Sequence, residues 1–267
     1  MVRRIYKKPH RARKHKPLIA KASFWRPVCI FGMACGGVWL ICFSPALEVR
    51  EISVAGAGDI SGRNCTEFIE GEVTKKIAFF DSKSILLFNL EQTKKEMLAR
   101  FPQIQDVKIE RQFPSKIIAS VEERRGVAMF AGAAGKKFLV DSAGIAFEET
   151  AGQDNLMEIS GDKDQGVIKL GDPAIAKETL LGILRIKEEM LASSGITAVS
   201  ASVDSPERVI LQIREGWYVY FNPLKDIDSQ SSKLTAVLND EAFKSKISNL
   251  EYIDVRFTRV YLKEKSQ

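Results

Sequence analysis

A stretch without any charged side chain, residues 27–47, follows a segment that holds ten Lys and Arg and no Asp or Glu. At about 1.5 Å of rise per residue, a helix of this length matches the roughly 30 Å hydrocarbon layer of a membrane. No water is present there to satisfy backbone groups, so only a helix can cross. The sequence therefore predicts a transmembrane helix over 27–47.

The basic segment, residues 1–26, sets the orientation of this helix. Its cations are Arg3, Arg4, Lys7, Lys8, Arg11, Arg13, Lys14, Lys16, Lys21 and Arg26. Lys and Arg beside a spanning helix are retained on the cytoplasmic face. We expect a single-pass protein of the inner (plasma) membrane, with residues 48–267 on the extracytoplasmic side.

Three other interpretations of the apolar stretch stay open. Ser44-Pro45-Ala46 loosely resembles the cleavage site of a secretory signal, although the basic segment is longer than is typical. A lipoprotein would use Cys35 in Gly32-Met33-Ala34-Cys35, but Gly32 replaces the expected aliphatic residue and the apolar run before the cysteine is short. A buried helix of a soluble protein would rarely lack polar residues over this length.

The basic character of the chain belongs to its first 26 residues. All 34 acidic residues follow residue 47, against 30 of the 40 Lys and Arg, so residues 48–267 carry a net charge of −4. No folded module or interleaved aromatic residues accompany the basic arm, which argues against nucleic-acid binding. We expect the arm to contact anionic lipid headgroups instead.

Histidine and cysteine usage excludes several chemistries from residues 48–267. Both histidines, His10 and His15, precede this part, and Cys65 is its one cysteine. It therefore has no imidazole for general base work, no His-ligated zinc site and no internal disulfide. Phosphate-binding loops and serine hydrolase motifs are also absent from it. We expect no enzyme activity, no cofactor and no metal, and a structural role for Cys65.

Residues 48–124 predict a strand, two helices and two further strands. Apolar alternation gives the first strand near residues 48–54. A helix is expected over about 64–80, with a core-facing stripe at helical spacing made of Phe68, Val73, Ile77 and Phe80. Asn89 can cap a second helix that Pro102 ends. Strands follow over 107–111 and 116–122, with Val107, Ile109, Ile117, Ala119 and Val121 facing inward.

Residues 125–267 predict a β-rich domain with embedded helices. Two short strands flank a turn over 141–144, Asp172 and Pro173 start a helix that Gly195 ends, and a short helix covers 233–238. Further strands cover about 197–203, 209–213 and 217–221. After Tyr252-Ile253-Asp254-Val255-Arg256-Phe257 the apolar alternation changes phase, which predicts a turn or bulge near Thr258 that keeps both apolar sets on the core. The last strand, near 259–263, is then expected at a sheet edge.

The order of these features resembles the FtsQ/DivIB family of bacterial cell division proteins. The resemblance lies in Val49-Arg50-Glu51-Ile52-Ser53-Val54-x-Gly56 behind a membrane anchor, in the segment from Phe101-Pro102 to Pro114, in Val121-Glu122-Glu123-Arg124, and in the run from Tyr252 to Arg256. It implies an FtsQ-type POTRA (polypeptide-transport-associated) domain over 48–124 and a β domain over 125–267. One departure from the family is Phe221-Asn222-Pro223, where a leucine-glycine step is usual.

The resemblance also implies a binding site. An edge strand can accept a strand from another protein or remain unpaired, and the residues alone favour neither. In FtsQ-like proteins the closing strand receives a strand from the small protein FtsB, which travels with FtsL. Carried to matching positions, the partner-binding residues are Arg256, Phe257, Thr258, Arg259, Val260 and Tyr261.

The expected function is that of a non-enzymatic scaffold that recruits septal peptidoglycan synthesis components. The POTRA-like domain is expected to bind other division proteins. Two alternatives remain: a membrane-anchored cell-wall enzyme or sensor, and a POTRA-bearing transport or assembly component. Members of the last class continue into a long barrel, for which 267 residues leave no room.

Overall fold

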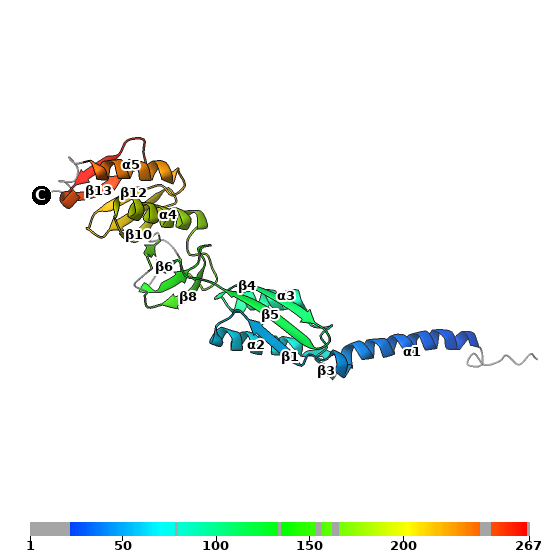
Figure 1. The fold of residues 1–267 in the computed structure, drawn as a ribbon. Coiled ribbons are helices and arrows are strands. Elements are labelled where there is room, and N and C mark those ends of the chain that lie inside the picture. Colours follow the sequence, from blue (N-terminus) through cyan, green and yellow to red (C-terminus); the bar gives the residue numbers. More distant parts are fainter. Residues whose placement is uncertain are drawn as a thin grey trace, which may run out of the picture. The chain divides into compact units, whose positions relative to one another are not determined.

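The computed structural model describes residues 22–77, 80–132, 135–152, 156–161, 166–240 and 247–265. It confirms the predicted α+β fold class, with an N-terminal apolar helix, a small α+β domain and a large β-rich part with embedded helices (Figure 1). The predicted basic tail lies outside the described residues up to position 21. Two compact units alternate along the chain: Met1–Ser53, Arg63–Leu90 and Ile109–Ala119 form one, and Val54–Gly62, Glu91–Lys108 and Ser120–Gln267 form the other. The domain limits 48–124 and 125–267 stay predictions.

Helix α1 spans Ala22–Phe43, so it starts and ends earlier than the predicted 27–47. A 3-10 turn over Pro45–Leu47 replaces the expected last helical turn, because Pro45 has no N–H to continue the helix. Within α1, the segment Trp25–Phe43 is long and apolar enough to cross a membrane by length and composition.

The small domain follows the predicted order of strand, helix, helix, strand, strand. Its elements are β1 (Glu51–Ala55), α2 (Asp59–Val73), α3 (Leu90–Arg100), β4 (Ile104–Gln112) and β5 (Lys116–Glu123). The strands are ordered β1-β5-β4 in one sheet. The five apolar residues expected to face inward on β4 and β5 are all buried, as the period-two pattern predicts.

The first predicted helix is wrong at its C-terminal end. Residues Lys75–Ile77 (β2) and Phe80–Ser82 (β3) form an antiparallel two-stranded ribbon instead of two more helical turns. The buried stripe of α2 is Cys65, Ile69 and Val73, at the regular spacing of four. Phe80, which the helical pattern placed in the core, is exposed because it belongs to the ribbon.

The rest of the chain builds a nine-stranded sheet ordered β14-β13-β12-β11-β10-β9-β6-β7-β8. Its strands are β6 (Ala128–Ala131), β7 (Lys137–Val140), β8 (Ala146–Thr150), β9 (Glu158–Ser160), β10 (Ala198–Ser205), β11 (Arg208–Ile213), β12 (Tyr218–Phe221), β13 (Leu250–Asp254) and β14 (Tyr261–Glu264). The pairs β6/β9, β9/β10 and β12/β13 are parallel. Parallel neighbours need a crossover, which α4 (Lys177–Ser194) supplies for β9/β10 and α5 (Ile227–Asn239) for β12/β13, while β7 and β8 lie between β6 and β9 in the chain.

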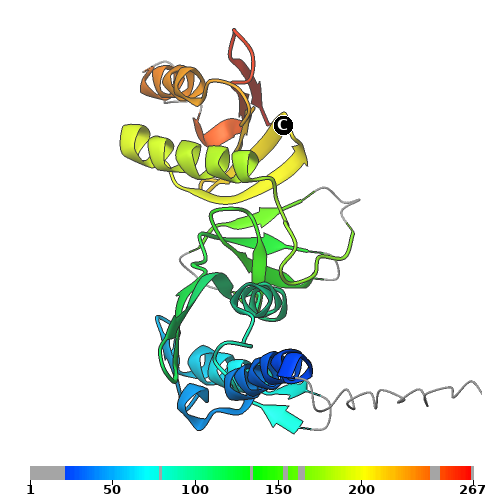
Figure 2. The same ribbon diagram turned by 90° about the vertical axis from the view of Figure 1, so that its right-hand side faces the viewer.

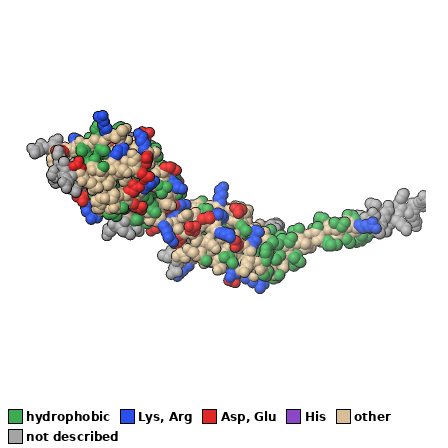
Figure 3. All heavy atoms as spheres, turned by 45° about the horizontal axis from the view of Figure 1, so that its top comes forward, with side chains coloured by type: hydrophobic (Ala, Val, Ile, Leu, Met, Phe, Trp, Pro, Cys, Tyr) green, Lys and Arg blue, Asp and Glu red, His purple; other side chains and the backbone are tan. Residues whose placement is uncertain are grey.

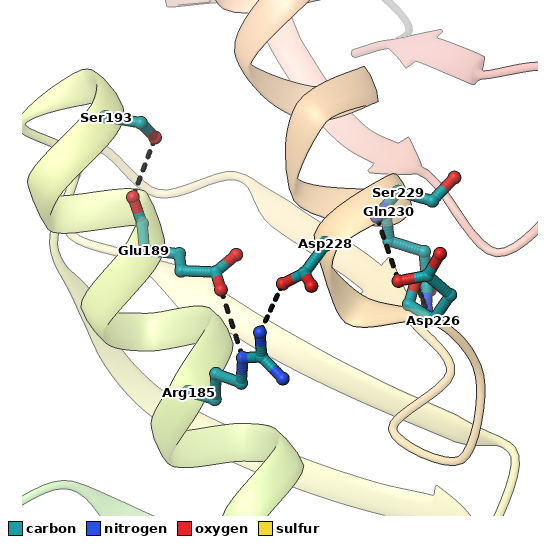
Figure 4. A network of polar contacts seen from close by, with 7 residues as sticks. All are labelled: Arg185, Glu189, Ser193, Asp226, Asp228, Ser229 and Gln230. Carbon is teal, nitrogen blue, oxygen red and sulfur yellow. Dashed lines mark hydrogen bonds and ion pairs between the residues drawn. The ribbon is translucent and has the colours of Figure 1, made fainter.

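Helices α4 and α5 lie on the same side of this sheet (Figure 2). The apolar residues of β10 to β13 that face them share one core with Leu180, Ile183 and Leu234 of the helices. On the surface, Arg185 of α4 forms ion pairs with Glu189 of the same helix and Asp228 of α5 (Figure 4). Asp226 caps α5 by accepting a hydrogen bond from the Ser229 N–H at 3.3 Å.

Helix α4 starts later than predicted, at Lys177 rather than at Pro173. The backbone of residues 172–174 forms hydrogen bonds outside the helix: the Ala146 N–H donates to the Asp172 carbonyl, and the Ala174 N–H donates to the Gly144 carbonyl. These bonds hold 172–174 against the turn after β7 in a non-helical conformation. The end of the helix is as predicted, with Gly195 in the left-handed conformation.

Candidate partner-binding edge

Strand β14 lies at one end of the nine-stranded order, beside β13. The two strands pair antiparallel, with Ile253 opposite Leu262 and Asp254 opposite Tyr261. All four residues of β14 are exposed. Alternate N–H and C=O groups of such a strand point away from its neighbour and are aligned for an added strand. The predicted edge position of the last strand is confirmed.

The six sequence-predicted residues fall on the connection into this strand. Arg256, Phe257, Thr258 and Arg259 form a bend after β13, Val260 follows it, and Tyr261 opens β14. The turn expected near Thr258 is therefore present. The expectation that both apolar sets stay on the core is wrong for Phe257 and Leu262, which are about half exposed. Val260 packs partly against the core.

Arg256 forms a two-bond fork with a carboxylate of its own chain. Its Nε donates to Asp254 Oδ1 at 2.9 Å and its Nη2 to Asp254 Oδ2 at 2.7 Å, and its backbone N–H also donates to Oδ1. Hydrogen bonding to buried Asp254 raises the pKa of Arg256. The guanidinium is thereby fixed in position, with two of its three nitrogens engaged.

Aromatic rings surround this guanidinium on the face of the sheet opposite the helices. The Arg256 Cζ lies 5.1 Å from the Phe257 ring centroid and 5.9 Å from that of Tyr220. Tyr220 stacks on Tyr252 with centroids 4.7 Å apart, and the Arg208 Cζ lies 5.1 Å from the Tyr220 centroid. These are cation–π distances. We call Arg208, Tyr220, Tyr252, Arg256, Phe257 and Tyr261 the cation–aromatic strip.

A lysine from α5 holds the bend from the other side. Lys233 Nζ donates to the Phe257 carbonyl at 2.8 Å and to the Val255 carbonyl at 3.3 Å. Phe257 in turn meets the Tyr261 ring edge to face, with centroids 5.8 Å apart. The bend is thus fixed by a helix, by Asp254 and by the first residue of β14.

Sequence reasoning missed Arg208, Tyr220, Tyr252 and Lys233. The alternation Tyr218-Val219-Tyr220-Phe221 could have placed Tyr220 opposite the buried face. The stacking of Tyr220 on Tyr252 depends on the parallel register of β12 and β13, which a 28-residue connection separates. No local pattern encodes that register.

Metal-ligating side chains do not gather into a cluster in the described part of the chain. No group of three His, Cys, Asp or Glu side chains within the described ranges lies close enough to hold a metal ion. Cys65 is fully buried on α2, which fits the structural role expected for it.

Comparison with known proteins supports the resemblance seen in the sequence. Residues 47–124 match the family model of the POTRA domain, FtsQ-type. A protein of Streptomyces bingchenggensis (strain BCW-1) named cell division protein FtsQ is 23% identical over 209 residues, which cover 77% of this chain and 74% of that protein. The chain thus carries an FtsQ-type POTRA domain behind an apolar N-terminal helix and is a distant homologue of a protein named cell division protein FtsQ.

Proposed function

We propose that this protein is a single-pass membrane scaffold of bacterial cell division that recruits septal peptidoglycan synthesis components by binding and performs no catalysis. Its N-terminus lies in the cytoplasm and residues 48–267 lie on the extracytoplasmic side. The main support for this proposal is that β14, the last strand of the described chain, is an exposed edge of the nine-stranded sheet, while the apolar helix lies near the N-terminus.

The proposed binding mode is strand addition to β14. A partner strand pairs with the outward N–H and C=O groups of Tyr261–Glu264, and these main-chain bonds supply affinity without fixing sequence. The cation–aromatic strip beside the edge supplies specificity. Its rings take an apolar partner side chain, and the remaining nitrogen of the Arg256 fork takes a carboxylate.

The partner that the family resemblance favours is an FtsB/FtsL-like complex of small bitopic division proteins. We assign its contacts to Arg256, Phe257, Thr258, Arg259, Val260 and Tyr261. The POTRA domain is proposed to bind other division proteins.

Capture of an FtsB/FtsL-like complex by the full chain in detergent tests this proposal. We expect Arg256→Glu and Phe257→Ala to reduce capture strongly. Glu148→Arg in β8, the strand at the opposite end of the sheet, reverses a charge on an exposed strand residue and should leave capture unchanged. Equal capture by the wild type and by both strip variants would remove strand addition at β14.

Proline substitution separates main-chain pairing from side-chain contact. Placed singly at Tyr261, Leu262 and Lys263, proline removes an N–H that faces either β13 or solvent. Where the N–H faces solvent the sheet should remain folded and lose partner binding. If every folded proline variant binds like the wild type, backbone pairing does not take place.

A further inference from the structure

The exit of α1 from the membrane is tied to the POTRA domain by hydrogen bonds. The last carbonyls of a helix lack partners within the helix. Here the Ser84 hydroxyl donates to the Ile41 carbonyl at 2.6 Å, and the Ser82 hydroxyl donates to the Cys42 carbonyl. The Ile85 N–H donates to the Leu47 carbonyl at 2.8 Å, and the Val49 N–H donates to the Lys83 carbonyl at 3.0 Å. The segment after β3 therefore lies directly at the end of the helix.

Exposed apolar side chains of the compact unit that contains α1 lie near the C-terminal end of this helix. Among its described residues outside α1, the exposed large apolar side chains are Phe80 at 67%, Phe113 at 59% and Leu86 at 39%. Phe80 lies in β3, and Leu86 directly follows Ile85, which bonds to Leu47. We call Phe80, Leu86 and Phe113 the helix-exit patch.

Phe113 reaches this end through the turn between β4 and β5. The Ser115 carbonyl in that turn accepts hydrogen bonds from the Arg50 and Glu51 N–H groups. The Arg50 guanidinium in turn donates to the Pro45 carbonyl at 2.9 Å. Figure 1 shows β3 and the turn between β4 and β5 at the end of the domain where α1 leaves it, and Figure 3 shows hydrophobic side chains gathered there.

The depth of Phe80 in a bilayer follows from its distance to Phe43. Phe43 is the last residue of the apolar span, and its ring lies 5.9 Å from that of Phe80, edge to face. The headgroup region on each side of the hydrocarbon is about 5–7 Å thick. A ring this close to Phe43 lies within that region or at the border of the hydrocarbon. Aromatic side chains are favoured at this depth.

We propose that the helix-exit patch rests in the headgroup region of the bilayer, on the side to which the POTRA domain belongs, so that the domain is seated on lipid. The proposal rests on the membrane anchor of the proposed function. The occupant is lipid because the patch continues the apolar surface of the spanning helix, and contiguous exposed apolar surface marks such contacts.

Charges beside the patch are mixed in sign. On the ribbon, exposed Lys76 stands opposite Asp81, and Lys75 pairs with Glu72 at 3.0 Å. Opposite charges placed across a ribbon compensate each other. The seating therefore depends on apolar insertion, and we expect it to be the same on zwitterionic and on anionic lipid.

Tryptophan quenching in vesicles tests this seating on the full chain. The protein is reconstituted in phosphatidylcholine vesicles with or without bromine on the acyl chains near the headgroup. In the reporter and control variants Trp25 and Trp39 are replaced by Phe, while Trp217, buried in the sheet core, is kept as a shielded reference. A separate variant carries Trp25→Phe alone and keeps native Trp39 as the membrane reference. Phe80→Trp and Leu86→Trp are the reporters, and Leu224→Trp, exposed in the loop after β12, is the matched control.

We expect brominated lipid to quench both reporters to the same fractional extent as native Trp39, and to leave the Leu224→Trp signal unchanged. Adding the anionic lipid phosphatidylglycerol to the vesicles should not change the extent to which the two reporters are quenched. The proposal is overturned if Trp39 is quenched while both reporters match Leu224→Trp, or if Leu224→Trp is quenched equally with them. If Trp39 itself escapes quenching, the anchor fails, and with it the proposed function.

Discussion

At the scale of single residues, Gly182 explains how the chain accommodates Phe221-Asn222-Pro223. Gly182 lies inside α4, and a Cβ there would lie 2.7 Å from the Pro223 Cβ and 3.1 Å from its carbonyl oxygen. The loop itself is closed by the buried Gln230 side chain, which accepts from the Asn222 N–H and donates to the Asn222 carbonyl, both at 2.9 Å. A side chain at position 182 would therefore clash with Pro223, and the hydrogen bonds of Gln230 hold the loop in place.

We therefore predict that Gly182→Ala lowers the free energy of unfolding by about 1–3 kcal/mol, the usual effect of overpacking a core. Gly71→Ala is the matched control, since no atom lies within 4 Å of a Cβ at Gly71 in α2. It should be neutral or stabilise by up to about 1 kcal/mol, through helix propensity. Urea unfolding measures both, followed by Trp217 fluorescence for Gly182→Ala and by far-UV circular dichroism for Gly71→Ala. A Gly182→Ala chain as stable as the wild type would show that α4 can shift.

A second residue-scale prediction concerns the ion pair of Arg124 and Asp141. Both side chains are largely buried, Arg124 Nε also donates to the Pro102 carbonyl at 3.0 Å, and Asp141 accepts from the Ala143 and Ile145 N–H groups. Arg124→Met leaves the Asp141 carboxylate buried without its cation, which costs about 3–5 kcal/mol. Arg125→Met, at an exposed neighbouring site, should change stability by less than about 0.5 kcal/mol. Equal unfolding midpoints for the two variants would contradict the structural role of this pair.

At the scale of elements, Lys233 connects α5 to the bend before β14, the proposed binding edge. Its two hydrogen bonds to the Val255 and Phe257 carbonyls hold the bend that carries the predicted contacts. We predict that Lys233→Met weakens partner binding about tenfold, since a charge-assisted hydrogen bond contributes about 1.5–3 kcal/mol and part of that loss appears as disorder of the bend. Titration of the full chain with the FtsB/FtsL-like complex measures the change.

Arg185→Met is the control for that variant. It removes the surface ion pairs of Arg185 with Glu189 and Asp228, which also involve α5 but lie away from the bend (Figure 4). Exposed pairs of this kind contribute little. Equal loss of affinity in both variants would mean that α5 acts through general stability rather than through the bend.

The elements also show what the sequence can and cannot predict. Strands β4 and β5, with their buried faces, follow from local alternation because antiparallel neighbours joined by a tight turn need no distant information. The ribbon β2–β3 was predicted as helix, since Val73, Ile77 and Phe80 share helical spacing while the contact of Phe80 with Phe43 is remote in sequence. The start of α4 was missed because the turn at Gly144 takes up the backbone of residues 172–174.

The same reasoning holds for the candidate site. The edge position of β14 and the turn near Thr258 follow from a change of phase within ten residues. The engagement of Arg256 by Asp254 was within reach of the sequence, as the two are neighbours on the same side of the strand. The contribution of Arg208, Tyr220 and Lys233 required the sheet order, which brings four separate segments to one place.

At the scale of the whole molecule, the proposed function needs three parts: an anchor helix, a POTRA domain hydrogen-bonded to the end of that helix, and a sheet with an exposed edge. A topology reporter fused after Gln267 should be active only outside the cytoplasm, as the cations before the apolar helix require. Activity of the reporter inside the cytoplasm would contradict the proposed orientation and leave the binding edge on the wrong side for an extracytoplasmic partner.

Hydrogen exchange of the full chain, with and without a bound FtsB/FtsL-like complex, tests the central claim of strand addition most directly. The outward N–H groups of β14 exchange from solvent when the strand is a free edge, and an added strand closes them. We predict slowed exchange at Tyr261–Glu264 on binding, with β8 at the other end of the sheet unchanged. Partner binding that protects other segments and leaves β14 exchange unaltered would contradict it.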